Sequence, residues 1–194
     1  MKLLAALLLA PILLVAPPRG PELVTVRVGH EQATGFVAGD GQVMTVAHVL
    51  GGGDDAFVAG GHDDQVVVDG RPATIVRVDR RLDLAWLHVS GLRGDQARLG
   101  GGGDTRLLGR PAPIVRHIRA SVDGGPRRPA FEIRADVAAG DSGAPLVTPT
   151  GRVAGVVFAR SRTRPGVAYA VAVDENSRLS PSTSPSKPRR ASVR

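Results

Sequence analysis

Ala139-Gly140-Asp141-Ser142-Gly143-Ala144-Pro145-Leu146 is the most informative stretch of this 194-residue chain. An Asp-Ser pair stands between two glycines, directly before an apolar run. A nucleophilic serine needs a tight turn that exposes its hydroxyl, and it needs backbone N–H groups aimed at the oxygen that becomes negative in the transition state. Glycine permits the backbone geometry of such a turn. The stretch therefore indicates a nucleophile at Ser142, an oxyanion hole made by the N–H groups of Gly140 and Ser142, and space behind the nucleophile at Gly143. Because all these residues are also common in ordinary turns, a plain turn is the alternative.

His48 is the candidate general base. It follows the apolar run Val43–Ala47 and precedes a run of three glycines. A general base has to be held at a fixed site with one ring nitrogen free for the serine, and the end of a rigid strand provides this. A structural histidine beside an apolar run is the alternative. The other histidines lack comparable flanks: His30, His62, His88 and His117.

Asp83 is the candidate partner of that histidine, because it is embedded in the apolar stretch Leu82–Leu87. A buried carboxylate is costly unless it is paired, and it is well used in accepting the second imidazole N–H. The alternative is an aspartate at the start of a strand, paired with Arg80 or Arg81. Asp79 is the nearest rival, but its flanks are charged rather than apolar.

The order of the three candidates along the chain is His48, Asp83, Ser142. This is the order in chymotrypsin, whereas subtilisins run Asp-His-Ser and α/β-hydrolases run Ser-Asp-His. Around these residues the chain resembles the trypsin/chymotrypsin superfamily, over about Leu23 to Leu179. The motifs that carry the resemblance are Thr34-Gly35-Phe36-Val37, Thr45-Val46-Ala47-His48-Val49-Leu50, Asp83-Leu84-Ala85, Gly140-Asp141-Ser142-Gly143 and Gly151-Arg152-Val153-Ala154-Gly155-Val156-Val157.

Within that superfamily the chain resembles the periplasmic protease domain of actinobacterial MarP-type membrane-anchored serine proteases. Ala135-Asp136-Val137 before the serine loop and Tyr169-Ala170-Val171 after it carry this likeness. The resemblance implies a serine endopeptidase that forms an acyl-enzyme and needs no cofactor or metal. A protease-like binding domain without activity is the alternative function.

The same resemblance implies where a substrate binds. Asp136 would lie at the base of the primary specificity pocket, with Gly166 and Arg160 near its walls. The edge strand Phe158-Ala159-Arg160 would pair with an extended peptide backbone. An acidic pocket floor favours Arg or Lys before the cut bond, unless Asp136 points away or Arg160 neutralises it.

The pattern of short apolar runs predicts an all-β fold of two antiparallel barrels, with roughly six short strands on each side of a linker and a short C-terminal helix at Asp174–Leu179. The resemblance implies that this is the chymotrypsin-like double six-stranded antiparallel β-barrel. The protease domain is expected at 23–179, with the first barrel at about 23–90 and the second at about 105–173. A Gly/Asp-rich linker separates them at Gly91–Asp104. The expected strands of the first barrel are Leu23–Val28, Thr34–Ala38, Val43–Ala47, Val66–Val68, Thr74–Val78 and Leu84–Val89. Those of the second are Arg106–Gly109, Ile114–Val122, Phe131–Arg134, Ala144–Val147, Arg152–Phe158 and Val167–Val171.

The amino-acid composition limits which residues can form the core and which kinds of functional site the chain can carry. Aromatic residues make up 3% of the chain, so the core has to be built from Val, Ala, Leu and Ile. Cysteine is absent, which excludes disulfides, thiolate zinc sites and a cysteine nucleophile. The net charge of +7 lies largely in the Pro/Ser-rich segment 180–194, which is predicted to be disordered. Basic residues without interleaved aromatics argue against a nucleic-acid partner.

The N-terminal segment 1–22 is predicted to be a signal peptide or membrane anchor. Met1-Lys2 gives a positive start, and Leu3–Ala16 is apolar but short of the ~20 residues that a spanning helix needs. Prolines 17, 18 and 21 then interrupt any helix. We therefore expect an extracytoplasmic protein, secreted or tethered to the outer face of the membrane, with membrane contact through this segment. Its partners would be protein or peptide substrates, and the chain is expected to be a monomer.

Overall fold

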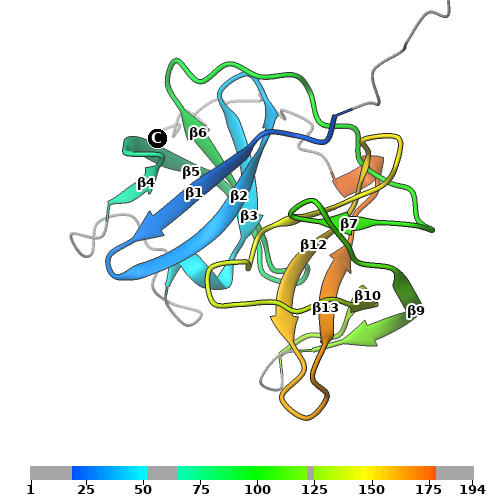
Figure 1. Ribbon diagram of the computed structural model, residues 1–194. Coiled ribbons are helices and arrows are strands. Elements are labelled where there is room, and N and C mark those ends of the chain that lie inside the picture. The colour runs from blue at the N-terminus through cyan, green and yellow to red at the C-terminus, as the bar shows by residue number, and fades with distance from the viewer. Residues whose placement is uncertain (1–18, 52–64, 122–124, 178–194) are drawn as a thin grey trace, which may run out of the picture.

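The computed structural model describes residues 19–51, 65–121 and 125–177. In these residues the chain forms thirteen strands and two short 3-10 helices, η1 (His48–Leu50) and η2 (Glu175–Ser177). The strands gather in two units that lie side by side, as Figure 1 shows. The all-β fold class and the division into two β units are therefore confirmed.

The first unit is a closed antiparallel barrel with the strand order β1-β2-β3-β6-β5-β4. Its strands are β1 (Leu23–Val28), β2 (Glu31–Gly39), β3 (Gln42–Val46), β4 (Val66–Val68), β5 (Arg71–Asp79) and β6 (Leu84–Val89). All six predicted strands of this half are present: β1, β4 and β6 have the predicted bounds, β2 and β5 are longer than expected, and β3 begins and ends one residue earlier. The two-residue turn between β2 and β3 is possible because Gly41 has φ 67°, a conformation that glycine adopts without strain.

The second unit is a seven-stranded antiparallel sheet with the order β8-β7-β11-β12-β13-β10-β9. Its strands are β7 (Arg106–Leu107), β8 (Arg110–Pro111), β9 (Ile114–Ala120), β10 (Arg128–Arg134), β11 (Pro145–Val147), β12 (Val153–Arg160) and β13 (Val167–Ala172). It has one strand more than predicted, because the expected strand Arg106–Gly109 is instead the start of a hairpin. Leu108 and Gly109 turn the chain there with φ angles of 49° and 79°.

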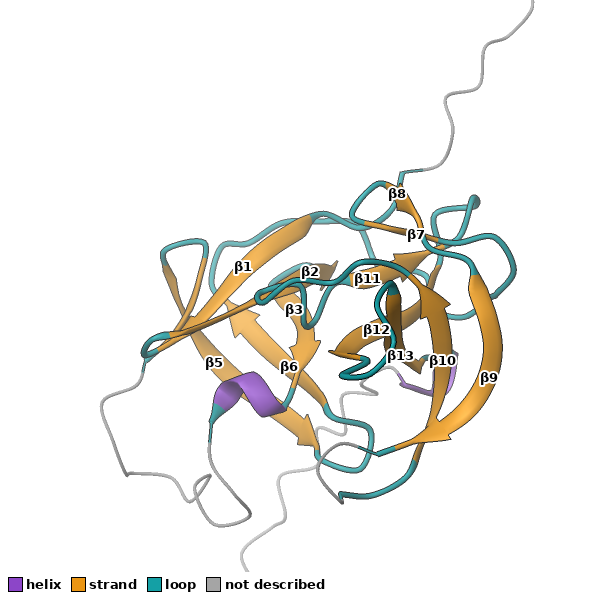
Figure 2. Ribbon diagram, turned by 60° about the horizontal axis from the view of Figure 1, so that its bottom comes forward, coloured by secondary structure: helices purple, strands orange, loops and turns teal. Residues whose placement is uncertain are grey.

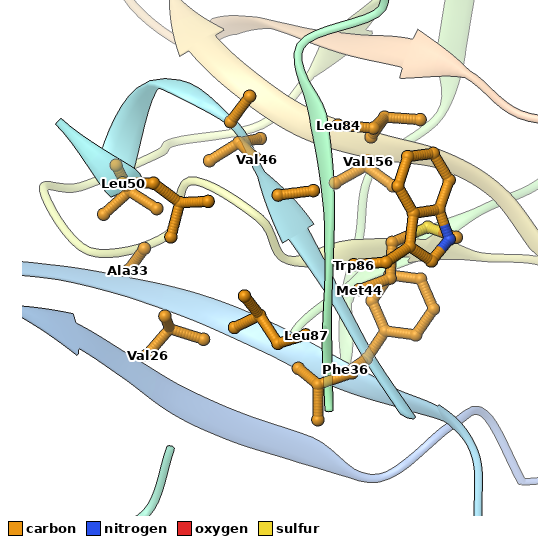
Figure 3. Close-up of a cluster of buried hydrophobic side chains, with 14 of the residues drawn as sticks. Val26, Ala33, Phe36, Met44, Val46, Leu50, Leu84, Trp86, Leu87 and Val156 are labelled. Atoms are coloured by element: carbon orange, nitrogen blue, oxygen red, sulfur yellow. The ribbon is translucent and has the colours of Figure 1, made fainter. Parts of the chain in front are cut away.

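The two units share a hydrophobic cluster, and the second unit has a further cluster of its own. In the shared cluster, side chains of the barrel pack with residues from the strands of the second unit: Ala130, Val153, Val156, Phe158 and Val171. Figure 3 shows Val156 of β12 among the barrel residues Val46, Leu84 and Trp86. Valine, leucine and alanine supply most of this core, as the scarcity of aromatics requires. Because dense packing resists sliding, the shared core fixes the two units relative to one another.

The remaining predictions of the fold concern the linker, the C-terminal helix and the two terminal segments. The predicted linker Gly91–Asp104 contains no strand, apart from an isolated bridge between Leu99 and Val153. The predicted C-terminal helix is present as the short η2, and Leu179 lies outside the described residues. Most of the predicted signal segment 1–22 and all of the basic tail 180–194 also lie outside them. The described ranges contain no helix with the length and apolar character of a membrane span.

Candidate active site

Asp83 and His48 form a tightly bonded pair. One carboxylate oxygen, Oδ1, accepts the backbone N–H of His48 at 2.9 Å, and the other, Oδ2, lies 2.9 Å from the ring Nδ1. Because a carboxylate only accepts, Nδ1 carries a hydrogen, and in the neutral ring Nε2 is then the acceptor. The side chain of Asp83 is 9% exposed and that of His48 is 48% exposed. The buried carboxylate therefore orients a ring that stays open to solvent and substrate.

The backbone around Asp83 is shaped to make this pair. Asp83 has φ 59°, an uncommon conformation for a residue with a side chain, although aspartate tolerates it better than most. Its carbonyl accepts the N–H of Ala47 at 3.1 Å, so the two chain segments are joined directly before His48. The rival Asp79 has a local role instead, because its carboxylate accepts the N–H of Leu82 at 2.9 Å.

The Ser142 loop docks on the first barrel through a threonine of β2. The N–H of Thr34 donates to the carbonyl of Ser142 at 2.8 Å, and the hydroxyl of Thr34 donates to the carbonyl of Gly140 at 2.7 Å. The buried hydroxyl of Thr45 donates in turn to the carbonyl of Thr34 at 2.7 Å. Thr45 lies on β3, which runs directly into His48. The serine loop and the histidine are thus both attached to the same end of the barrel.

Gly143 explains why this docking requires glycine. It has φ 90°, and a Cβ at this position would collide with the carbonyl oxygen of Thr34 and the hydroxyl of Thr45. Its N–H donates to the carbonyl of Val157 at 2.7 Å, which ties the loop to β12. The space that the sequence predicted behind the nucleophile is occupied by the backbone of Thr34, which belongs to the first unit.

Two N–H groups of the loop have no acceptor. Within the loop, the N–H groups of Asp141, Gly143 and Ala144 all donate to backbone carbonyls. Those of Gly140 and Ser142 donate to nothing among the described residues. The carboxylate of Asp141 accepts the N–H of Ala138 at 2.9 Å, which stabilises the turn. Since unpaired donors are uncommon in folded chains, this pair is available for an anionic oxygen.

The third contact of the expected triad is absent from the described residues: no hydrogen bond joins the hydroxyl of Ser142 to the ring of His48. The structure brings Asp83 and His48 together and docks the serine loop on β2, which Thr45 bonds to β3, the strand that leads into His48. In unliganded enzymes, the hydrogen bonds of catalytic groups are often long and become short only with substrate present.

Arg128 is a site residue that sequence reasoning missed. It begins β10, its side chain is 5% exposed, and its Nη1 lies 3.1 Å from Oδ2 of Asp83. Its guanidinium stacks 5.3 Å from the ring centre of Phe158. The contact with Asp83 is an ion pair without hydrogen-bond geometry, and Nε and Nη1 have no hydrogen-bond partner in the described part of the chain. The sequence context of Arg128, Arg-Arg-Pro, gave no indication that this side chain is buried beside Asp83.

The predicted substrate-binding residues fall in two places. Asp136, Arg160 and Gly166 line one pocket of about 740 Å³, which also contains Asp141. Ala159 and Arg160 line a second groove together with Phe158. Phe158 itself is buried, so it contributes to the floor rather than to an open edge.

Comparison with known proteins agrees with the fold. The sequence profile of the trypsin-like peptidase domain matches residues 33–156. Serine proteases Rv3671c and MT3772, from two strains of Mycobacterium tuberculosis, are each 36% identical to the chain over 147 residues. The match covers 66% of this chain but only 36% of either relative, so the chain spans about a third of the length of these curated proteins.

Solved structures give the same result. The active form of the Rv3671c protease from M. tuberculosis has a TM-score of 0.63 at 28% identity, covering 89% of this chain and 90% of that one. An inactive form of it has a TM-score of 0.63 at 31% identity, covering 79% and 84%. The HtrA-type protease AlgW with a tripeptide has a TM-score of 0.62 over 80% of this chain and 57% of that one, and at 21% identity it supports the fold alone. The chain therefore belongs to the trypsin-like serine peptidase family.

Proposed function

We propose that this protein is a serine endopeptidase in which Ser142 is the nucleophile, His48 the general base and Asp83 the residue that orients the base. One observation carries the proposal. The carboxylate of Asp83 is bonded to both the backbone and the ring of His48, while the serine loop is docked on Thr34 of β2, whose carbonyl is bonded by Thr45 of β3, the strand before the same histidine. No other aspartate pairs with a histidine in the described ranges.

The proposed reaction is acyl transfer followed by hydrolysis. Nε2 of His48 takes the proton of the Ser142 hydroxyl as its oxygen attacks the peptide carbonyl, and the imidazolium then gives that proton to the leaving amine. Water attacks the acyl-enzyme with the same base. The oxyanion of each tetrahedral intermediate accepts the N–H groups of Gly140 and Ser142, which have no other acceptor in the described chain.

The backbone of β12 offers a place for the substrate. β11 pairs with β12 only as far as Val156, and Val157 is bonded to the serine loop. Beyond it, Ala159 and Arg160 pair with β13 alone, so the opposite edge of the strand is open. We propose that the residues before the cut bond add to this edge as an antiparallel strand.

The primary pocket is proposed to be the one lined by Asp136 and Gly166. An added Cβ at Gly166 would lie 3.7 Å from Oδ1 of Asp136, so the two residues are close neighbours there. Four arginines line the same pocket: Arg110, Arg160, Arg162 and Arg164. The arginines outnumber the two aspartates of this pocket, Asp136 and Asp141, so its lining carries a net positive charge and we expect no preference for Arg or Lys before the cut bond. A peptide-library profile dominated by Arg or Lys would contradict this.

A fluorophosphonate probe tests the enzyme assignment. Such a probe reacts covalently with an activated serine, so wild-type protein should be labelled at Ser142 and Ser142→Ala should not. Labelling of His48→Ala should fall by orders of magnitude, since the base is gone. Folded wild-type protein that is not labelled at Ser142 would support the alternative, a protease-like binding domain without activity.

We also propose that the enzyme acts outside the cytoplasm as a monomer. The apolar segment Leu3–Ala16 after Met1-Lys2 supports export, either by a cleaved signal or by a retained anchor. N-terminal sequencing of exported protein distinguishes the two forms. Retention of the whole chain in the cytoplasm would contradict the proposal.

A further inference from the structure

Next to the open edge of β12 lies a groove of about 970 Å³ whose walls are strongly cationic. It is bounded by β9, β10 and the segment that joins β12 to β13, and Figure 2 shows β9 and β10 on the side of the molecule away from the barrel. Six arginines line it: Arg116, Arg119, Arg127, Arg160, Arg162 and Arg164. Among the described residues that line it, Glu132 is the one acidic side chain.

Glu132 neutralises part of one wall and makes it rigid. Its side chain is 5% exposed and accepts two hydrogen bonds from Arg164, at 2.9 and 2.6 Å, and one from Arg116 at 2.8 Å. Arg164 also donates to the hydroxyl of Tyr169 at 2.8 Å. The hydrogen bonds from Arg164 and then Arg116 lower the pKa of Glu132 to about 2, so it stays ionised at neutral pH.

Arg119, Arg127 and Arg160 supply positive charge that Glu132 does not pair with. Arg119 and Arg127 donate to each other's backbone carbonyl at 3.0 and 3.2 Å, which fixes both side chains across the β9–β10 pair. Neither of these arginines, nor Arg160, forms an ion pair with a carboxylate in the described ranges. Cations that are held by backbone carbonyls but have no carboxylate partner, such as Arg119 and Arg127, are suited to bind an anionic group, because little ordering is left to do on binding.

The groove adjoins the proposed site. Ala159 and Arg160 line it, and these residues form the edge on which the substrate backbone is proposed to pair. Phe158 also lines it, and the ring of Phe158 stacks against Arg128, which contacts Asp83. Peptide residues that precede the cut bond therefore pass along the arginine wall.

We infer that this protein selects acidic peptide segments, with Asp or Glu side chains before the cut bond bound by Arg119, Arg127 and Arg160. The inference rests on the proposed function, because it uses the same site and the same direction of the substrate. Each exposed Arg–carboxylate pair is weak, but a groove lined by one sign of charge adds steering to the contacts. Two acidic residues should raise kcat/KM by about 5- to 30-fold over their amides at low ionic strength.

Quenched fluorescent peptides test the inference. Three peptides share one cleavable bond and carry Glu-Glu, Gln-Gln or Lys-Lys at the third and fourth positions before it. Wild-type enzyme should cleave them in the order Glu, Gln, Lys, and the preference should shrink as salt rises. The double variant R119Q/R127Q should lose most of the preference, as should R160Q. The control R71Q, an exposed arginine of β5 far from the groove in sequence and on the other unit, should keep it. Equal cleavage of the Glu and Gln peptides, or a preference that survives both groove variants, would overturn the inference.

A binding measurement separates this inference from the enzyme assignment. Ser142→Ala cannot turn over, so its affinity for the Glu-Glu peptide reports the groove alone. It should bind this peptide more tightly than the Gln-Gln peptide by a similar factor, whether or not wild-type protein is labelled by fluorophosphonate. Equal affinities of Ser142→Ala for the Glu-Glu and Gln-Gln peptides would contradict the acidic preference, even if the wild-type protein is an active enzyme. Vesicles with anionic lipid test the other source of negative charge. If the wild-type protein binds them in competition with the peptide, but binds the Glu-Glu and Gln-Gln peptides equally, the arginines bind a lipid surface and the inference is wrong.

Discussion

Arg128 places its Nη1 3.1 Å from Oδ2 of Asp83, the oxygen that also accepts the hydrogen bond from the ring of His48. A buried cation therefore shares the carboxylate that is proposed to stabilise the imidazolium. Arg128 comes from β10 of the second unit, whereas Asp83 and His48 belong to the first. The ion pair links the two units at the point where charge is proposed to develop in the reaction.

Replacing Arg128 by methionine should move the acidic limb of the pH dependence of kcat/KM to higher pH, by about one unit. The reason is electrostatic: a carboxylate no longer shared with a guanidinium favours the protonated ring of His48 more strongly. Arg128→Lys keeps the charge and should return the limb toward its original position. Rates measured from pH 5 to 9, with circular dichroism to verify folding, check this. A limb unchanged in both variants would show that Arg128 is only structural.

Asp83→Asn should lower kcat by about 10³- to 10⁴-fold while the protein stays folded. Asparagine tolerates the positive φ of this position but presents an amide to Nδ1 of His48, which favours the wrong tautomer. The matched control is Asp79→Asn, where the amide oxygen can still accept the N–H of Leu82. Steady-state kinetics on a single peptide check both variants. Comparable losses in the two would remove Asp83 from the proposed triad.

The candidate site residues that could be predicted from the sequence are those marked by a pattern in their immediate neighbours. Glycines around Ser142, the apolar strand before His48 and the apolar flanks of Asp83 are all short-range signals, and the strands followed from runs of valine and leucine. The chain order of the three residues then connected them. The pairing of Asp83 with His48 could be inferred from that order, and the structure shows the contact.

Other features depend on contacts that no local pattern encodes. Arg128 pairs with a residue 45 positions earlier in the chain, and its Arg-Arg-Pro context is typical of an exposed loop. Thr34 and Thr45 dock the serine loop through a relay of hydroxyl and carbonyl groups, which requires the two units to meet. The hairpin at Leu108 needs a positive φ at a leucine, which residue statistics disfavour.

Gly143→Ala should destabilise the protein by about 3 kcal/mol or more, because the new Cβ collides with the Thr34 carbonyl in addition to the strain of a positive φ. Gly109→Ala is the control. Gly109 also has a positive φ, at 79°, but a Cβ there meets no atom within 4 Å, so the expected cost is about 1–2 kcal/mol. Denaturant unfolding gives both values. Equal costs would mean that the serine loop is not packed against β2.

Because of Glu132, the free energy of unfolding should depend on pH between 4.5 and about 2. Hydrogen bonds from Arg164 and Arg116 lower its pKa from an ordinary 4.5 to about 2. The unfolded chain therefore binds a proton at a higher pH than the folded chain does, so this stabilisation is complete above pH 4.5 and is lost as pH falls toward 2. In Glu132→Gln the melting temperature should fall less steeply over this window than in wild type. Glu31→Gln, at an exposed position of β2, should keep the wild-type slope. If wild type and Glu132→Gln lose stability in parallel, the carboxylate is not ionised against the two arginines in the folded state, and the charge assigned to that wall of the groove has to be revised.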